Sequence, residues 1–347
     1  MSEPERILII RLSSLGDILH ALPACQAVRH ARPQARIDWL VEKSNAFLLS
    51  AVGGIDEVVS IDMRTLRRAP WNPGAWRSLV SSLAALRAKK YDLALDFQGL
   101  VKTGLLAWCS GARLRFGFSR QYVRERAAAL FYNRPFAPPR GSMHVIEMNL
   151  MLARAAGVAR AAAAVEFREN PEDARAVAAL LEKEKLSVFA VINPGGGWPT
   201  KRWPPARYAA LADRMGRELQ LRVAVTTGPG EAAIYDEIAG HCTGPPPAHL
   251  QVPFLQLIPL FARARLVIGG DTGPFHLACA LGRPVVGIFG PTSPERNGPY
   301  GNPARVVCRR LHCSFCYGRS CPTRNECMEI GVDEVFEAVR QCLDETQ

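Results

Sequence analysis

Short apolar runs alternate with longer segments of helical spacing along the chain. The runs of strand length cover residues 7–10, 37–41, 57–61, 92–96, 188–193, 222–226, 266–268 and 285–289. Between them, apolar residues recur three and four positions apart, which predicts helices over 18–30, 76–89, 144–156, 172–185, 206–218, 232–239, 254–262, 275–281 and 332–343, with another starting at 101. Strands that alternate with helices are typical of parallel sheets. The unbroken apolarity of Val285 to Phe289 is typical of a strand that is covered on both faces. The pattern therefore predicts an α/β protein.

The pattern divides into two halves at a short segment of small and polar residues. Residues 157–164 are rich in small side chains, and 167–171 are polar. A chain of 347 residues is long enough for two ordinary domains. We therefore expect an N-terminal domain over 1–165 and a C-terminal domain over 166–331, which includes the cysteine-rich segment 308–327. A final amphipathic helix is expected within 332–347.

The turns after two of the predicted strands carry distinctive side chains. Asp271, Thr272 and Gly273 follow the strand 266–268, at a place where open α/β sheets bind ligands and where free N–H groups favour phosphate. Asp271 and Thr272 could equally serve only as helix caps. Asp17 ends a similar turn after the first strand. The sequence of this turn is not the GxGxxG dinucleotide fingerprint. Asp17 can act as a general base, or it can simply complement the positive end of the following helix.

A glycine-rich segment follows the first strand of the second half. Gly195 and Gly196 come directly after the strand 188–193, and glycine lets a ligand approach the backbone closely. Lys201 is the natural charge to meet a phosphate there. Glu231 follows the strand 222–226 and is placed to accept hydrogen bonds from a ribose, although an ordinary acidic helix start has the same local sequence. Glycine-rich loops occur for many reasons, so this segment by itself is a weak signal.

The charge balance favours an anionic partner. The chain has 43 Lys and Arg against 32 Asp and Glu, which suits nucleic acid, a phosphorylated substrate or a membrane surface. Arginine clusters at 64–68 and 120–126 could clamp phosphates or carboxylates through the bidentate guanidinium, or they could be solvated loops. The sequence carries no aromatic-interleaved RNA signature and no recognition helix, which disfavours nucleic acid.

The expected location is cytoplasmic. No apolar run approaches the roughly 20 residues of a membrane span, and the first residues lack the basic start of a signal peptide. Most cysteines should therefore be reduced.

Four of the cysteines have spacings that can hold a structural metal. Cys313, Cys316, Cys321 and Cys327 could bind zinc or an iron–sulfur cluster. The second pair is Cys-x5-Cys rather than a second CxxC, so a reduced packed loop or an incidental disulfide remain alternatives. The sequence has no motif for an open catalytic metal site.

Four motifs, in order along both halves, carry a resemblance to a known family. They are Ile10 to Pro23, Tyr91 to Lys102, Asn193 to Gly195 with Lys201 to Pro204, and Asp271 to Gly273 with His276 and Gly290 to Thr292. Together they resemble glycosyltransferase family 9, and within it the ADP-heptose:lipopolysaccharide heptosyltransferases, most of all those of type I. Leu130 to Arg134 adds a further type I feature. The cysteine-rich tail departs from the best-known type I enzymes and looks more like tails found elsewhere in the family.

The resemblance implies a fold and a reaction. The fold is GT-B: two Rossmann-like domains with parallel sheets facing a central cleft, the acceptor on the N-terminal side and the nucleotide sugar on the C-terminal side. In such folds the last helix commonly packs back on the N-terminal domain. The reaction is an inverting transfer of L-glycero-D-manno-heptose from ADP-heptose to Kdo of Kdo2-lipid A in the lipopolysaccharide inner core, with no cofactor required. Peripheral contact with the anionic inner face of the inner membrane follows from such an acceptor.

The resemblance also assigns roles residue by residue. Asp17 is the expected general base, and Lys201 is the cation expected to stabilise the departing diphosphate. The other expected donor-site residues are Gly195, Gly196, Glu231, Asp271, Thr272, Gly273 and His276. The residues expected to grip the acceptor are Arg11, Ser13, Ser14, Arg64, Arg68, Arg124 and His144.

Three other interpretations compete with this one. The first is a type II heptosyltransferase or another family 9 enzyme with a different acceptor. The second is a sugar-nucleotide epimerase on the same fold, and the third is a non-catalytic anion-binding protein.

Overall fold

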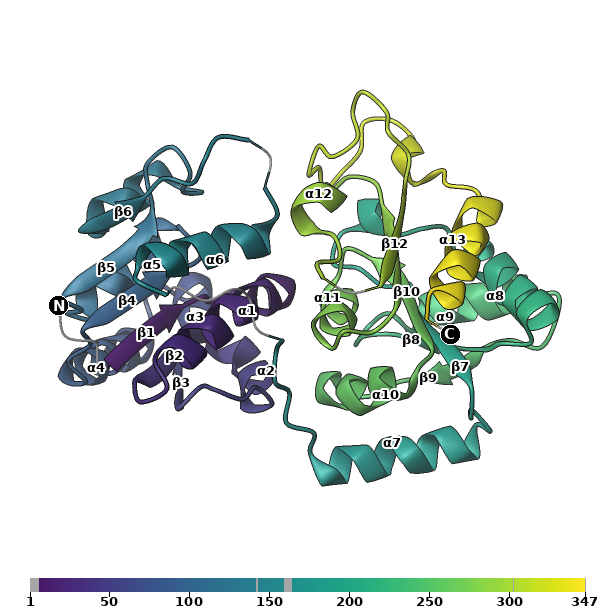
Figure 1. Cartoon of the computed structure of the whole chain (residues 1–347), viewed down its shortest axis with the longest axis horizontal. Helices are drawn as coiled ribbons and strands as arrows, with labels where there is room; N and C mark the ends of the chain where they lie inside the picture. The colour runs from purple at the N-terminus through teal and green to yellow at the C-terminus, as the bar shows by residue number, and fades with distance from the viewer. Residues whose placement is uncertain (1–5, 142, 159–163, 302, 347) are drawn as a thin grey trace. The chain divides into compact units, whose positions relative to one another are not determined.

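The chain folds into two compact units. The computed structural model describes residues 6–141, 143–158, 164–301 and 303–346, and its elements group into Met1–Arg168 and Glu169–Gln347 (Figure 1). This division falls shortly after the expected boundary at residue 165. Residues 159–163 of the expected linker lie outside the described residues. Each unit contains a six-stranded sheet of its own.

A parallel sheet forms the centre of the first unit. Ile7 of its strand β1 stands opposite Ile37 on one side and Leu93 on the other. Because every pairing in the sheet is parallel, the carboxyl ends of all its strands share one edge. In spatial order the strands are β3 (Glu57–Ile61), β2 (Arg36–Glu42), β1 (Arg6–Ile10), β4 (Leu93–Asp96), β5 (Leu114–Phe118) and β6 (Arg134–Phe136).

Helices cover this sheet, and residues 7–10 of β1 are fully buried. Leu86 of α4 and Leu106 of α5 join Leu8 and Ile10 of β1 in one core cluster, while α1 packs against α6. The helices are α1 (Leu15–Ala31), α2 (Ala46–Ser50), α3 (Met63–Arg68), α4 (Pro73–Ala88), α5 (Val101–Cys109) and α6 (Val145–Ala155), with the 3-10 turns η1 (Lys43–Asn45) and η2 (Arg126–Phe131).

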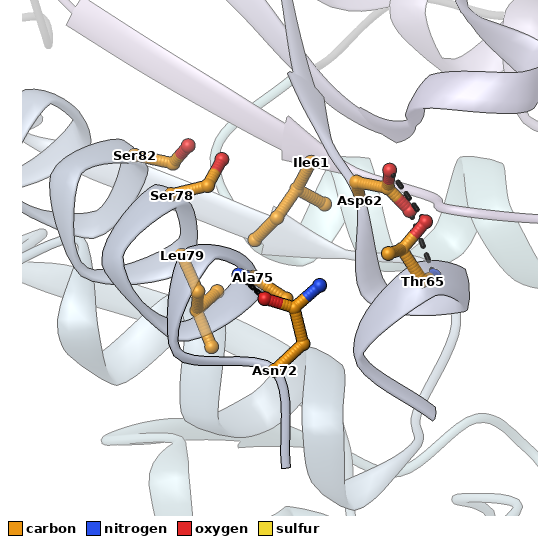
Figure 2. Close-up of a pocket in the computed structure, with 8 residues that line it drawn as sticks. All are labelled: Ile61, Asp62, Thr65, Asn72, Ala75, Ser78, Leu79 and Ser82. Atoms are coloured by element: carbon orange, nitrogen blue, oxygen red, sulfur yellow. Dashed lines mark hydrogen bonds between the residues drawn. The ribbon is translucent and has the colours of Figure 1, made fainter. Parts of the chain in front are cut away.

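The first arginine cluster is a helix rather than the expected loop. Its residues form α3, which begins because the Asp62 carboxylate accepts hydrogen bonds from the Thr65 N–H and the Thr65 hydroxyl, each at 2.9 Å (Figure 2). The arginines therefore project from a helix that follows β3 at the carboxyl edge of the sheet.

The second unit repeats the same architecture. In spatial order its parallel strands are β12 (Ala304–Cys308), β11 (Val285–Phe289), β10 (Leu266–Gly270), β7 (Phe189–Asn193), β8 (Arg222–Thr226) and β9 (Ala248–Leu250). Its helices are α7 (Pro171–Lys183), α8 (Pro205–Leu219), α9 (Ala232–His241), α10 (Leu257–Arg263), α11 (Gly273–Ala280), α12 (Pro294–Asn297) and α13 (Val332–Asp344), with the 3-10 turns η3 (Pro199–Lys201), η4 (Phe254–Gln256) and η5 (Glu326–Met328).

The final helix, which was expected to pack back on the N-terminal domain, packs its apolar side on the second unit. The apolar side of α13, including Val335 and Val339, is buried in the core that α8, β10 and β11 share. The Arg214 guanidinium of α8 lies 3.9 Å from the centroid of the Phe336 ring. The Trp203 indole donates a hydrogen bond to the Ile330 carbonyl at 3.0 Å, just before the helix. Burying its apolar face within its own unit is the physical reason for this placement.

Candidate active site

Asp17 lies in the first turn of α1, after Ser13 and Ser14, at the carboxyl edge of the first sheet. One of its carboxylate oxygens accepts hydrogen bonds from the Ser14 N–H at 3.0 Å and the Ser14 hydroxyl at 2.9 Å. The other meets the Arg11 guanidinium at 2.7 Å. Burial raises the pKa of Asp17, but the Arg11 charge and the Ser14 N–H outweigh it and hold that pKa below its ordinary value of 3.8. Asp17 is therefore an ionised carboxylate at neutral pH, and 35% of its side chain is exposed.

Arg11 joins the first and second sequence motifs. Its buried guanidinium pairs with Asp17 and also donates to the Phe97 carbonyl. The Leu12 N–H donates to the Gln98 side-chain oxygen at 2.7 Å. Arg11 was expected to grip the acceptor, but the structure commits much of its hydrogen-bonding capacity to internal partners. Its clearest role is to position Asp17.

Asp96 shapes the second motif, a role that the sequence did not reveal. Its side chain is fully buried at the end of β4 and accepts hydrogen bonds from the Tyr132 hydroxyl at 2.6 Å and the Gln98 N–H at 2.8 Å. Burial raises its pKa above the ordinary value, against these hydrogen bonds. Because Asp96 fixes the turn that holds Gln98, it supports the neighbouring turn of Asp17 indirectly. Its place in the Tyr91 to Lys102 motif was the only signal available.

Two of the predicted acceptor arginines lie beside the same turns. The Arg64 N–H donates to a Glu42 carboxylate oxygen at 3.2 Å, and the Glu42 N–H donates to the Leu12 carbonyl at 3.2 Å. The Arg124 backbone packs against Gly99 in the turn after β4: its nitrogen lies 3.5 Å from the position that a Cβ on Gly99 would occupy. The side chains of Arg64 and Arg124 are both exposed. The structure therefore brings two exposed cations to the surroundings of Asp17 within the first unit.

The remaining predicted acceptor residues are more dispersed. His144 caps α6, because its Nδ1 accepts a hydrogen bond from the Ile146 N–H at 3.2 Å. The His144 ring also meets His20 of α1 edge-on, with centroids 5.9 Å apart. Ser14 is exposed at the start of α1, and Arg68 is exposed at the end of α3.

Lys201, Asp271 and His276 form a buried ionic group at the carboxyl edge of the second sheet. The Lys201 ammonium donates to an Asp271 carboxylate oxygen at 2.7 Å and to the Asp271 carbonyl at 3.1 Å. The other Asp271 oxygen bonds the His276 Nε2 at 2.7 Å. The Lys201 and Asp271 side chains are 14% and 6% exposed. Burial raises the pKa of Asp271, but the His276 hydrogen bond and the Lys201 charge outweigh it, so that pKa lies below its ordinary value of 3.8.

The predicted phosphate-binding loops lie next to each other in the second unit. Thr272 caps α11: its hydroxyl accepts from the Phe275 N–H at 3.4 Å and donates to the Asn193 side-chain oxygen at 3.2 Å. A Cβ on Gly196 would lie 3.6 Å from the Thr272 methyl group. The glycine-rich loop after β7 therefore borders the N-terminus of α11, where Gly273 is the first helical residue. The first N–H groups of a helix have no partner inside it, which suits an anion.

Glu231 holds two glycine turns together. One carboxylate oxygen accepts from the Gly196 N–H at 3.0 Å, and the other accepts from the Gly228 N–H at 2.9 Å. Gly195 packs so tightly against this carboxylate that a Cβ there would collide with it. The structure therefore explains why glycine occupies position 195, and it joins Glu231 to the predicted donor site.

Two further residues of the donor loop were not predicted to take part. The Lys201 ammonium lies 4.4 Å from the centroid of the Trp198 ring, which adds a cation–π contact to its surroundings. Arg202 donates two hydrogen bonds to the Gly196 carbonyl, at 3.0 and 2.8 Å. Arg202 lies in the third sequence motif and Trp198 lies three residues before Lys201, and these positions were the available signal.

The cysteine-rich segment packs against the loops of this site. The Thr200 hydroxyl donates to the Gly318 carbonyl at 2.8 Å, and the Asn325 side chain donates to the Thr200 carbonyl at 3.0 Å. The Tyr317 N–H donates to the Pro291 carbonyl at 2.8 Å. Because Thr200 immediately precedes Lys201, the segment braces the turn that presents the cation.

The predicted metal site in this segment stays a prediction. Cys327 is buried, whereas Cys313, Cys316 and Cys321 are exposed, and each of them is a free thiol. The Gly318 N–H points at the Cys316 sulfur, 3.4 Å away. Among the residues that the structure describes, no three His, Cys, Asp or Glu side chains are placed to share a metal ion.

Across the described ranges, each helix is too short or too polar to cross a bilayer.

Each unit, taken by itself, presents groups that suit one part of a group transfer. The first presents an ionised carboxylate with exposed arginines nearby, which can accept a proton from a hydroxyl. The second presents a fixed ammonium beside a helix N-terminus and a glycine loop, which can stabilise a phosphate leaving group.

Comparisons with known proteins agree with this chemistry. The family model for glycosyltransferase family 9 (heptosyltransferase) matches residues 80–326. Lipopolysaccharide heptosyltransferase 1 of Pseudomonas aeruginosa is 30% identical over 324 residues, which cover 91% of this chain and 87% of that protein. The solved structure of E. coli heptosyltransferase WaaC with ADP matches with a TM-score of 0.75 and 26% identity, covering 99% of this chain and 100% of that one. The structure of WaaC with ADP-2-deoxy-2-fluoro heptose matches with a TM-score of 0.71 and 25% identity, over the same shares of both chains.

Proposed function

The chain belongs to glycosyltransferase family 9, the heptosyltransferases, and on this premise we propose that it transfers L-glycero-D-manno-heptose from ADP-heptose to a Kdo sugar of Kdo2-lipid A. Its two units are the Rossmann-like domains of the GT-B fold. The observation that carries the proposal is the cation of the second unit: Lys201, held by Asp271 beside the N-terminus of α11. A diphosphate is the anion that this arrangement suits.

The donor site is built from the second unit. Lys201 and the N–H groups of Thr272 and Gly273 stabilise the diphosphate of ADP-heptose, and Gly196 lets the phosphates approach the backbone. Glu231 accepts hydrogen bonds from the ribose with the lone pairs that the glycine N–H groups leave available.

Asp271 and His276 act on the donor through Lys201. The Asp271 carboxylate is already shared between the lysine and the histidine, and it is 6% exposed. We therefore assign Asp271 and His276 the positioning of the ammonium group in place of the expected direct contact with heptose.

The acceptor is activated by the first unit. Asp17 takes the proton of the acceptor hydroxyl as its oxygen forms a bond to the anomeric carbon of heptose. The bond between that carbon and the phosphate oxygen breaks, and ADP leaves with the electron pair. Attack from the face opposite the phosphate inverts the anomeric configuration. Arg11 keeps Asp17 oriented and ionised.

The exposed basic groups of the first unit bind the acceptor's anionic groups. Arg64 and Arg124 stand next to the turns around Asp17, and their guanidinium groups suit the phosphates of lipid A and the carboxylates of Kdo. Ser13, Ser14, Arg68 and His144 complete the proposed acceptor site. A lipid-anchored acceptor places the enzyme at the anionic inner face of the inner membrane.

A transfer assay with defined substrates tests the proposal. Purified protein with ADP-heptose and Kdo2-lipid A is expected to release ADP and to give a product heavier by one heptose, with inverted anomeric configuration. Transfer only to an acceptor that already carries heptose would instead indicate a type II enzyme. A converted sugar nucleotide formed without any acceptor would indicate an epimerase. Equal binding of ADP, GDP and UDP with no transfer would indicate an anion-binding protein.

A further inference from the structure

A stripe of exposed apolar side chains runs along one side of α5. Val101, Leu105 and Trp108 follow one another at intervals of four and three residues, so they share one side of the helix. They are 36%, 41% and 53% exposed. Leu106 and Ala107, on the opposite side, are buried in the core beneath the helix. The helix therefore turns an apolar side outward, although a surface helix normally turns a polar side to water.

Neighbouring segments extend this apolar surface. Leu130 of η2 is 82% exposed, and η2 packs tightly on α5, since a Cβ on Gly104 would lie 2.9 Å from the Ala128 carbonyl oxygen. Helix α4 packs beside α5 in the same core cluster, and its Trp76 and Val80 are 48% and 62% exposed. We call these six residues the docking face: Trp76, Val80, Val101, Leu105, Trp108 and Leu130.

The part of α4 that contributes to the docking face does not line the pocket beside this helix. Figure 2 shows Ser78, Leu79 and Ser82 on the side of α4 that faces α3, where they line a pocket of about 150 Å³. Trp76 and Val80 are not among the lining residues. The preceding loop is held to α4 by the Trp76 indole, which donates to the Pro70 carbonyl at 2.6 Å.

The surroundings of the docking face are strongly basic. Residues 63–140 contain 15 Lys and Arg against 3 Asp and Glu, a net charge of +12, while the whole chain carries +11. The net positive charge of the protein therefore resides in this segment. The four helical segments α3, α4, α5 and η2 contain no acidic residue. Of the three acids in 63–140, Asp96 is buried and Glu125 accepts a hydrogen bond from the Val101 N–H.

We propose that the docking face of the first unit inserts into the headgroup region of an anionic lipid bilayer. Tryptophan with flanking arginine and lysine is the combination that membrane–water interfaces favour, and basic segments are drawn to anionic leaflets. An apolar helix side with a cationic border lies in the interface plane without crossing the bilayer. This inference rests on the proposed function to the extent that a lipid-anchored acceptor gives such a surface its use.

A second copy of the chain fits this surface poorly. A symmetric dimer through the docking face would bring two segments of net charge +12 together, and like charges that face each other oppose association. Anionic lipid headgroups instead neutralise that charge.

Vesicle co-sedimentation of the full chain tests the proposal. We expect binding to vesicles of phosphatidylethanolamine with phosphatidylglycerol, and little binding to vesicles of phosphatidylcholine alone. The triple variant Leu105→Ser, Trp108→Ser, Leu130→Ser is expected to bind anionic vesicles at least about tenfold more weakly, because it removes much of the apolar area available for insertion. The matched control is Val188→Ser, Tyr300→Ser, Val306→Ser in the second unit, whose side chains are 55%, 37% and 38% exposed. The control is expected to bind like the unmodified protein.

Three outcomes would overturn the proposal. They are equal vesicle affinity of the triple variant and the unmodified chain, binding that ignores lipid charge, and a dimer in size-exclusion chromatography that the triple variant dissolves. A separate assay keeps the proposed function distinguishable: the triple variant should transfer heptose to a delipidated Kdo acceptor at the unmodified rate. If neither protein transferred heptose, the proposed function would fail while the vesicle result stood.

Discussion

Replacing Lys201 by Met tests the centre of the proposed donor site. Methionine keeps an unbranched stem of similar length and removes the charge. Two interactions are lost together: the ammonium that the proposal places on the diphosphate, and the 2.7 Å ion pair with the buried Asp271. A double variant, Lys201→Met with Asp271→Asn, separates these two losses. It also lacks the ammonium, but it has no Asp271 carboxylate left unpaired.

Lys201→Met should lower both kcat and the free energy of unfolding, and the expected size of each loss can be stated separately. Removing a donor that stabilises charge in the transition state typically lowers kcat by about 10² to 10³. Breaking a buried ion pair by removing one partner typically costs about 3 to 5 kcal/mol of stability. Asp271 keeps its hydrogen bond to His276 at 2.7 Å, so we expect the lower end, about 3 kcal/mol. In the double variant the unpaired charge is gone, so most of this stability should return while kcat stays low.

Rates of ADP release and urea unfolding of the same preparations measure these two quantities. Lys201→Met should lower both kcat and the free energy of unfolding, whereas the double variant should lower kcat alone. The reasoning is refuted if the double variant regains the unmodified kcat, since Lys201 would then serve only to neutralise Asp271. It is also refuted if Lys201→Met alone keeps the unmodified kcat.

Four further predictions concern the proposed base, its pH dependence, the donor loop and the cysteine-rich segment. Asp17→Asn should bind ADP normally but transfer heptose about 10² to 10⁴ times more slowly; calorimetric titration and the transfer assay check this, and normal turnover would exclude Asp17 as the base. Because the folded pKa of Asp17 lies below 3.8, Asp17 stays ionised throughout pH 5 to pH 8. Protonation of Asp17 should therefore cause no fall in kcat/KM at the acid end of this range, and a fall that is absent in Asp17→Asn would contradict this. Gly195→Ala should raise KM for ADP-heptose, because its Cβ displaces the Glu231 carboxylate, and an unchanged KM would contradict that close packing. If Cys313 and Cys316 belong to a metal site, protein purified anaerobically should contain about one equivalent of zinc, or iron with sulfide, and metal-free protein would end that prediction.

Most strands could be predicted from the sequence, including the edge strand β3, but β5, β6, β9 and β12 could not. Runs such as Ile7 to Ile10 are buried on both faces, so their unbroken apolarity is sufficient evidence for a strand. Strands β5 and β12 are largely half-buried and contain arginine, so they lack a continuous apolar signal. The three-residue strands β6 and β9 are too short to show any period.

The apolar spacing predicted which segments form helices better than it predicted where those helices pack. The apolar spacing of α13 predicted an amphipathic helix, but the spacing does not say which core receives its apolar side. The expectation that it returns to the first unit came from the resemblance, and the structure shows its apolar side in the core around Val335 and Val339. The helix α3 was missed because half of its residues are arginine and it has no apolar period, so only the Asp62 cap at its start marks it.

The candidate site depended on the motifs more than on local pattern. Lys201 and Asp271 are 70 residues apart in the sequence, and nothing in their own segments indicates that they pair. Each loop separately had an ordinary explanation as a turn or a helix cap. The parallel sheet resolves this, because it gathers the ends of β7, β8 and β10 at one edge. Asp96 and Arg202 were missed because their roles lie in holding backbone turns.

The most direct test of the central claim is a crystal structure of the protein with a non-transferable ADP-heptose analogue and a Kdo acceptor. We predict the Asp17 carboxylate within about 2.6 to 3.2 Å of the acceptor hydroxyl, with Lys201 on the diphosphate of the same complex. A complex in which the analogue occupies the second unit while the acceptor hydroxyl lies beyond reach of Asp17 would contradict it.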